Sequence, residues 1–223
     1  MNKKILVLVP FLLLTVGCST KKESSTSIDS ETSLDSSESI NSDESSSSEP
    51  IYTLFDKVFT FKDGIYANKN FGIDDTDANK ATFLDNLNTE AGTEMFTSLS
   101  VEKCFFNIYG EETNKYTMVV GSQKYLGKMT LNSSYDIVKV KASVQAYNKY
   151  ISYNDSWSID SEVKFSLMDE TFDLSDTIKE NEAPEIVTKE VNVGHTNKLT
   201  INGLSGRFFL HQLTVTYRIL GCA

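Results

Sequence analysis

From Ile51 onward the chain consists largely of short segments in which apolar and polar residues alternate. Alternation with a period of two predicts strands that bury one face. The strands expected on this basis cover residues 54–61, 99–109, 116–120, 127–131, 137–147, 162–167, 185–193, 198–201 and 207–219. Clusters of Asn, Asp, Ser and Gly separate them, and helices do not alternate with them. The pattern therefore predicts a mainly β domain, an antiparallel β-sandwich with one short helix.

The one expected helix runs from about Asp77 to Ala91, because apolar residues recur there at helical spacing. Thr76 or Asp77 can cap its start, and Gly92 can close its end. We expect this helix to pack on the edge or the end of the sandwich.

The last expected strand changes the parity of its apolar residues. Phe208 and Leu210 share one parity, whereas Leu213, Val215 and Tyr217 share the other. A strand cannot keep one face in the core across such a change unless an extra residue is inserted. The sequence therefore predicts a β-bulge near His211–Gln212.

The first 18 residues have the organisation of an export signal. Lys3 and Lys4 precede an apolar run, residues 5–14, that is too short to span a bilayer as a helix. The ending Thr15-Val16-Gly17-Cys18 resembles the lipobox of bacterial lipoprotein precursors, although Thr15 stands where that family prefers Leu. The resemblance implies that residues 1–17 are a signal peptide and that Cys18 is lipidated. The alternative is an ordinary cleaved signal with an incidental cysteine.

Residues 18–50 form a tether in this interpretation. Residues 19–50 contain 14 serines and eight acidic residues, and only three large apolar side chains. Such a composition cannot bury enough surface to offset its ordering entropy, so we expect disorder. A flexible chain of this length spans about 30 Å. The expected location is the extracellular face of the cell membrane, with lipid as the anchor.

Residues 51–223 are long enough for one well-filled core and short for two. The whole chain has a formal charge of −10, and this segment remains acidic without the tether. An acidic domain argues against nucleic acid as a partner.

Several segments of the second half resemble a known group of domains: residues 127–131, 137–142, 164–167, 198–201 and 207–217. The last of these has an Arg-aromatic start and a Leu-Thr-Val-Thr-Tyr end. The segments are similar to the jelly-roll modules, galactose-binding-like and carbohydrate-binding, of secreted hydrolases and nucleases of Gram-positive bacteria. The resemblance implies a jelly-roll fold whose loops select a ligand. Residues 152–162 and 176–184 depart from the pattern.

Motifs for catalysis are scarce. The chain has two histidines, His195 and His211, and lacks the usual zinc, redox and serine-hydrolase motifs. The segment from Gly121 to Met129 differs from a phosphate loop in its spacing and in having Met at the magnesium-binding position. We expect no enzymatic activity and no cofactor, although two suitably spaced carboxylates could hydrolyse glycosides.

A structural calcium ion is left open. Asp75, Asp77 and Asn79 have the spacing of oxygen ligands, but Lys80 occupies the position where an EF-hand needs Gly. An acidic start of the helix explains the same residues.

Cys104 and Cys222 are the only cysteines besides Cys18. They either form a disulfide, which export permits, or remain two separate thiols.

The aromatic residues Tyr147, Tyr150, Tyr153 and Trp157 lie in one strand-loop stretch beside Asn and Asp residues. Flat rings flanked by amides and acids suit the apolar face and the hydroxyls of a sugar. The same rings could instead pack on the sandwich. We expect a non-catalytic module that binds a glycan or cell-wall saccharide, with a surface protein as the alternative partner.

Overall fold

A computed structural model describes residues 50–62, 72–108, 116–151, 156–179 and 182–221, and for residues 149–151, 156 and 157 it describes only the backbone. The predicted signal peptide, the predicted lipidation site Cys18, the predicted tether, Tyr153 and Cys222 lie outside these residues. Residues Tyr52–Gly221 form one compact unit.

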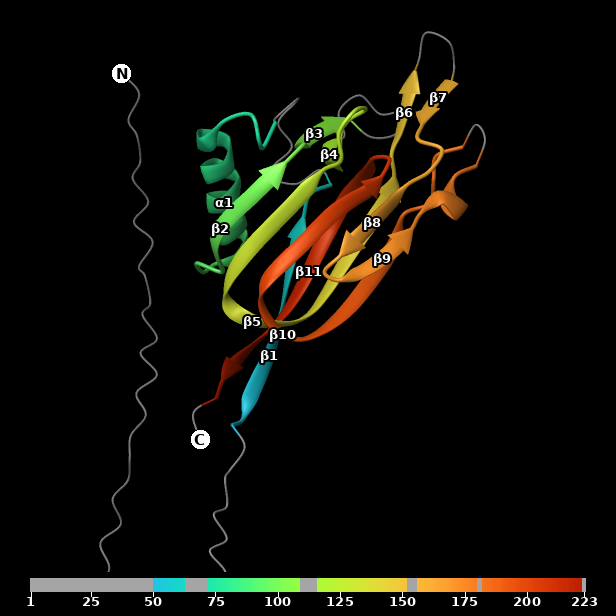
Figure 1. Ribbon diagram of the computed structural model, residues 1–223. Helices are drawn as coiled ribbons and strands as arrows, with labels where there is room; N and C mark the ends of the chain where they lie inside the picture. The colour runs from blue at the N-terminus through green and yellow to red at the C-terminus, as the bar shows by residue number, and fades with distance from the viewer. Residues whose placement is uncertain (1–49, 63–71, 109–115, 152–155, 180–181, 222–223) are drawn as a thin grey trace, which may run out of the picture. The chain divides into compact units, whose positions relative to one another are not determined.

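The unit is mainly β and antiparallel, with one α-helix, and this confirms the predicted fold class (Figure 1). Eleven strands occur in the described residues. They are β1 (Tyr52–Thr60), β2 (Phe96–Glu102), β3 (Cys104–Ile108), β4 (Tyr116–Val120), β5 (Lys128–Ala146), β6 (Asn148–Ile151), β7 (Ser156–Ile159), β8 (Lys164–Leu167), β9 (Glu170–Asp173), β10 (Val187–Ser205) and β11 (Phe208–Leu220). A short 3-10 helix, Ser175–Thr177, follows β9.

Nine strands form one curled sheet. We call its two parts halves: in one, β5 pairs with β2, and in the other, β5 pairs with β11. The long strands β5 and β10 run through both halves. The first part of β5 pairs with β2 and with the end of β10, which in turn pairs with β8. The second part of β5 pairs with β11 and with the start of β10. The polar segments near residues 133–136 and 193–197, predicted as breaks between strands, are therefore bends within continuous strands.

One apolar cluster fills the space between the halves and holds most of the buried side chains. The largest come from both halves and from the helix: Phe59, Phe61, Phe83, Phe96, Phe106, Phe165 and Phe208. A smaller cluster of Val119, Tyr147 and Phe209 lies apart from it.

Helix α1 (Asp77–Ala91) has the predicted bounds. The Thr76 side chain accepts a hydrogen bond from the Asn79 backbone N–H, and Gly92 ends the helix with φ 72°. Phe83 and Leu87 are its buried residues, and the helix packs against β1 and β2.

The predicted bulge is present in β11. Leu210 pairs with Val144 and Gln212 with Ser143, so His211 is the extra residue. Its carbonyl accepts backbone hydrogen bonds from Phe61 at 2.8 Å and from Lys62 at 3.1 Å. The bulge thus returns the apolar residues on both sides of it to the same core.

Candidate functional site

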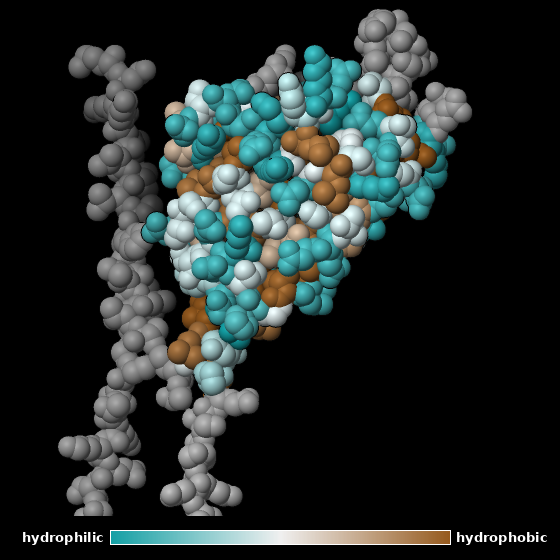
Figure 2. Space-filling view, in the orientation of Figure 1, coloured by the Kyte–Doolittle hydropathy of each residue, from teal (hydrophilic) through white to brown (hydrophobic). Residues whose placement is uncertain are grey.

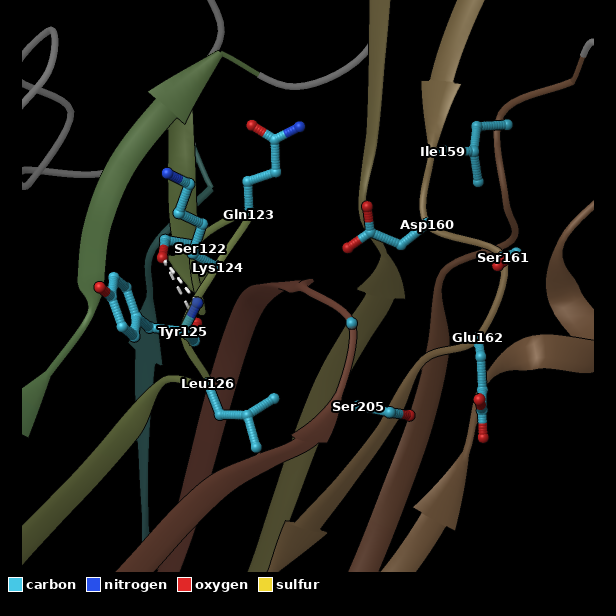
Figure 3. A pocket seen from close by; sticks show the side chains of 11 residues that line it. Ser122, Gln123, Lys124, Tyr125, Leu126, Ile159, Asp160, Ser161, Glu162 and Ser205 are labelled. Atoms are coloured by element: carbon cyan, nitrogen blue, oxygen red, sulfur yellow. Dashed lines mark hydrogen bonds between the residues drawn. The ribbon is translucent and has the colours of Figure 1, made fainter.

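A cleft of about 480 Å³ lies where three connections meet (Figure 3). The β4–β5 loop contributes residues 122–126, the β7–β8 connection contributes residues 159–162, and the β10–β11 turn contributes Ser205 and Gly206. Figure 3 shows the Asp160 carboxylate and the Leu126 side chain directed toward the space between the loops, with Tyr125 on the rim. The lining combines apolar, hydroxyl, amide and charged groups.

The loop that forms the first wall is held rigidly at its base. The Ser122 backbone N–H donates to the Tyr125 carbonyl at 2.8 Å, and the Tyr125 N–H donates to the Ser122 hydroxyl at 3.2 Å. At Gly127 a Cβ atom would lie 2.2 Å from the Gly121 nitrogen, so the two ends of the loop approach more closely than a side chain allows. Tyr125 is 62% exposed on this preformed support.

The opposite wall is fixed by a clamp between Arg207 and Asp160. The Arg207 guanidinium donates to the carboxylate at 2.9 Å through Nε and at 2.6 Å through Nη2. The Arg207 backbone N–H donates to the same carboxylate at 2.7 Å. The guanidinium also lies 3.7 Å from the centroid of the Tyr147 ring. Arg207, the residue before β11, therefore holds the β7–β8 connection in place.

Both carboxylates of the cleft are engaged by cations. Glu162 accepts from Lys164 at 2.7 Å, and this hydrogen bond raises the pKa of the Lys164 ammonium above its usual value. Asp160 is engaged by Arg207. Lys124 forms no ion pair with any other described residue, so it contributes positive charge to the cleft that no carboxylate there offsets.

Two polar side chains near the cleft are buried without a hydrogen-bond partner among the described residues. They are the hydroxyl of Ser205, which lines the cleft, and the amide of Asn148, which pairs in register with Ile159. Buried polar groups are normally satisfied by protein, water or a ligand. The Ser205 hydroxyl is therefore an unsatisfied buried group in the wall of the cleft.

The aromatic residues predicted as the binding site separate into two groups. Tyr150 and Trp157 lie directly opposite one another in the β6–β7 hairpin, and β7 ends at Ile159 in the cleft wall. Tyr147 instead is buried. Its ring is stacked on the ring of Phe209, with 5.2 Å between the centroids, and the Arg207 guanidinium lies over it. Burial raises the pKa of its hydroxyl. Tyr147 thus positions Arg207 and presents no ring face to a ligand.

Sequence reasoning missed the residues of the β4–β5 loop, namely Gln123, Lys124, Tyr125 and Leu126. The pair Gly121 and Gly127 was the available signal, because two glycines around a short polar and aromatic segment are typical of a tight loop. A comparison with phosphate loops alone did not reveal this role.

The residues considered for calcium are separated in the structure. Asp77 is almost fully exposed and pairs with Lys80 at 3.1 Å, whereas the Asn79 side chain donates to the Gly72 carbonyl at 2.7 Å. Within the described residues, no group of three or more His, Cys, Asp or Glu side chains is placed to hold a metal ion.

Cys104 is a free thiol, fully buried in the core. Cys222 lies outside the described residues, so the disulfide between the two stays a prediction.

His211 and His195 lie apart from the cleft. His211 is buried at the bulge, with Nε2 2.9 Å from Oε1 of Gln145. His195 is exposed in β10 and lines a second hollow, also of about 480 Å³. That hollow is lined by residues of β10 together with Met168 and Asp169 from the β8–β9 connection and Glu170 of β9.

No helix in the part of the chain that the structure describes is long and apolar enough to cross a membrane. Comparison with protein-family models, curated proteins and solved structures gave no match.

Proposed function

We propose that this chain is a lipoprotein anchored at the cell surface through Cys18, and that its β module binds a saccharide without transforming it. Residues 19–50 form the tether between the lipid and the module, on the basis of their serine and acid content. The binding site is the cleft between the β4–β5 loop, the β7–β8 connection and the β10–β11 turn.

The chemistry of the cleft is the observation that carries this proposal. Sugars offer hydroxyls around an apolar ring, and they are recognised by preformed sites that combine aromatic or aliphatic surface with hydrogen-bonding groups. The cleft has this combination in Leu126, Gln123 and the rim residue Tyr125. The β6–β7 hairpin, with Tyr150 and Trp157 in register, leads directly into its wall. These features support a site that extends from the cleft to the hairpin.

The arrangement of the carboxylates favours binding over hydrolysis. A glycosidase needs one carboxyl group that donates a proton and a second that acts as base or nucleophile. Asp160 and Glu162 are each held by a cation in hydrogen-bond contact. They are therefore better suited to fixing the walls of the cleft than to proton transfer.

A glycan array probed with the purified full chain tests the proposal. Tyr125→Ala and Trp157→Ala should each weaken binding to the best glycan about thirtyfold, since a stacked ring contributes roughly 2 kcal/mol. Their melting temperatures should stay close to that of the parent. Ile186→Ala, which removes an exposed apolar side chain outside the cleft, is the matched control and should bind normally. Unchanged glycan binding by both aromatic variants would reject this site.

The anchor has its own test. Cys18→Ala should release the protein from the membrane fraction and abolish incorporation of a clickable fatty acid. Label that persists on the substituted chain would contradict lipidation at Cys18.

A surface protein is the alternative ligand. It becomes the better explanation if no glycan binds the parent chain while a fixed partner cell retains it in a Tyr125-dependent manner.

A further inference from the structure

The arm formed by β1 and the end of β11 carries a concentration of exposed apolar residues. Figure 1 shows both strands extending beyond the rest of the sheet, and Figure 2 shows apolar surface gathered there. The exposed fractions reach 60% at Leu54 and 61% at Leu220. The other large exposed side chains of the arm are Tyr52, Phe55, Val58 and Ile219. A cluster of this kind on a soluble domain usually marks a contact surface.

Strand β1 is also an open edge. Among the described strands it pairs only with β11, in an unbroken antiparallel register from Tyr52 to Thr60. An edge of this length with apolar side chains is a template for another strand.

The hydrogen bonds of Thr60 show which backbone groups face outward. Its N–H donates to the Glu90 carboxylate of α1 at 3.1 Å rather than to β11. Because the bonding direction alternates along a strand, the N–H and C=O groups of Tyr52, Leu54, Asp56 and Val58 also face away from β11. None of these four residues has a backbone partner on that side within the described residues. The helix thus closes the edge at Thr60 and leaves residues 52–58 open.

We propose that this open edge pairs with the same edge of a second copy of the chain, antiparallel and about a twofold axis at Phe55. Phe55 is the midpoint of the open segment. With the axis there, Leu54 lies opposite Asp56 of the second copy, and Tyr52 lies opposite its Val58. All four outward residues of each chain are then paired, which gives about eight hydrogen bonds.

Two arguments favour this register over its neighbours. An axis at Leu54 would place Val58 opposite position 50, outside β1, and leave its outward groups unpaired. Charge disfavours the neighbouring axes on the other side. An axis at Asp56 places that carboxylate directly opposite its own copy, and an axis at Lys57 does the same for two ammonium groups. With the axis at Phe55, Asp56 faces Leu54 and Lys57 faces Thr53, so no like charges meet. In each copy the Phe55 ring is stacked on the Tyr217 ring, with 5.7 Å between the centroids. The centroid of the Tyr217 ring lies 4.9 Å from that of Tyr135. Pairing joins these rows into one continuous aromatic surface across the axis.

Other occupants of the edge fit less well. A bilayer could cover the apolar side chains, but it has no groups to satisfy the outward N–H and C=O groups. The chain's own tether carries eight acidic residues between positions 19 and 50 and would bring carboxylates against Asp56. A second β1 satisfies the backbone and avoids this repulsion.

Register-specific disulfide formation tests the pairing. Thr53 of one copy should lie directly opposite Lys57 of the other, within the Cα separation that a disulfide requires. Two identical positions, 53 with 53 or 57 with 57, are offset by about 13 Å and cannot be joined. The full chain is expressed in bacterial cells with Cys222→Ser, to remove the C-terminal thiol. The Cys222→Ser chain without further changes is the control, because any disulfide that it forms must involve Cys18 or Cys104.

Thr53→Cys and Lys57→Cys chains with different tags are co-expressed, oxidised and separated on a non-reducing gel. We expect a mixed dimer at least tenfold more abundant than the dimer from either variant alone. Leu54→Pro removes one outward N–H, a change that an edge strand tolerates, and should abolish the mixed dimer without a large change in the melt. Equal cross-linking of every combination would indicate random collision of chains and no fixed register. Absence of the mixed dimer with both thiols reactive would show that the edge stays unpaired, and either result overturns the proposal.

Discussion

The substitution Asp160→Asn tests whether the Asp160–Arg207 ion pair contributes to the stability of the domain. Asp160 accepts three hydrogen bonds from Arg207, and the side chains of the pair are only 20% and 15% exposed. An asparagine keeps one acceptor oxygen, but its NH₂ group faces Nη2 and leaves the guanidinium without a counter-charge. Breaking a fully buried pair costs about 3–5 kcal/mol, and partial exposure here reduces the expected loss to about 2–3 kcal/mol.

Asp136→Asn is the matched control, because Asp136 also accepts from an arginine. Its partner Arg218 lies 3.0 Å away, but the carboxylate is 44% exposed at the base of the arm. Solvent screening limits the contribution of such a pair to less than about 1 kcal/mol. Both variants remove the same charge, so the difference between them isolates the effect of burial.

Calorimetric melts provide the comparison. For a domain of this size, about 1 kcal/mol shifts the melting temperature by roughly 2–4 °C. Asp160→Asn should therefore lower the melt by about 4–12 °C, and Asp136→Asn by at most about 4 °C. Equal shifts in the two variants would refute the conclusion that the clamp holds the cleft wall.

Three further predictions concern the backbone, the buried thiol and the tether. Gly206→Ala should lower the free energy of unfolding by about 3 kcal/mol or more, because the added Cβ would lie 2.2 Å from the Glu162 carbonyl oxygen. Gly194 has open space around it and φ +52°, so Gly194→Ala should lower the free energy of unfolding, measured by chemical denaturation, by only about 1 kcal/mol. Cys104 should resist iodoacetamide in the native protein and react once unfolded, since burial raises the pKa of its thiol and removes it from solvent; rapid native labelling at Cys104 by mass spectrometry would contradict this. Deleting residues 19–50 should leave the melting temperature unchanged, and a drop of several degrees would show that the tether contributes to folding.

The elements whose sequence signal is local were predicted well. Thr76 and Gly92 define the helix through capping chemistry that needs no tertiary contact. The parity change between Leu210 and Leu213 located the bulge, because the core constrains both sides of it.

The errors arise where tertiary structure overrides the local pattern. The polar segment near Ser134 was predicted as a break between two strands, but there β5 bends from one half of the sheet to the other and stays paired. Residues 99–109 were predicted as one strand, but Lys103 separates β2 from β3. Its φ of 50° is in the left-handed region, which interrupts the extended backbone. A pattern of side chains does not distinguish a bend from a turn, since both expose polar residues.

The cleft was only partly predictable for a related reason. Tyr147 belongs to the aromatic stretch in the sequence, but it lies between β5 and β6 with its ring packed on Phe209 in the interior. Tyr125 lies 22 residues earlier in a separate loop, and only the fold brings that loop near Asp160.

The pairing of the first strand with the last has a mechanical consequence. The proposed tether enters at the start of β1, opposite Leu220, whereas the cleft lies beyond the start of β11 at its other end. Tension between a bound ligand and the membrane would therefore run along β1 and β11 and load them in shear. Nine residue pairs would carry that force at the same time, instead of separating one after another. A module anchored in the proposed way would thus be pulled in the orientation in which a two-strand connection best withstands force.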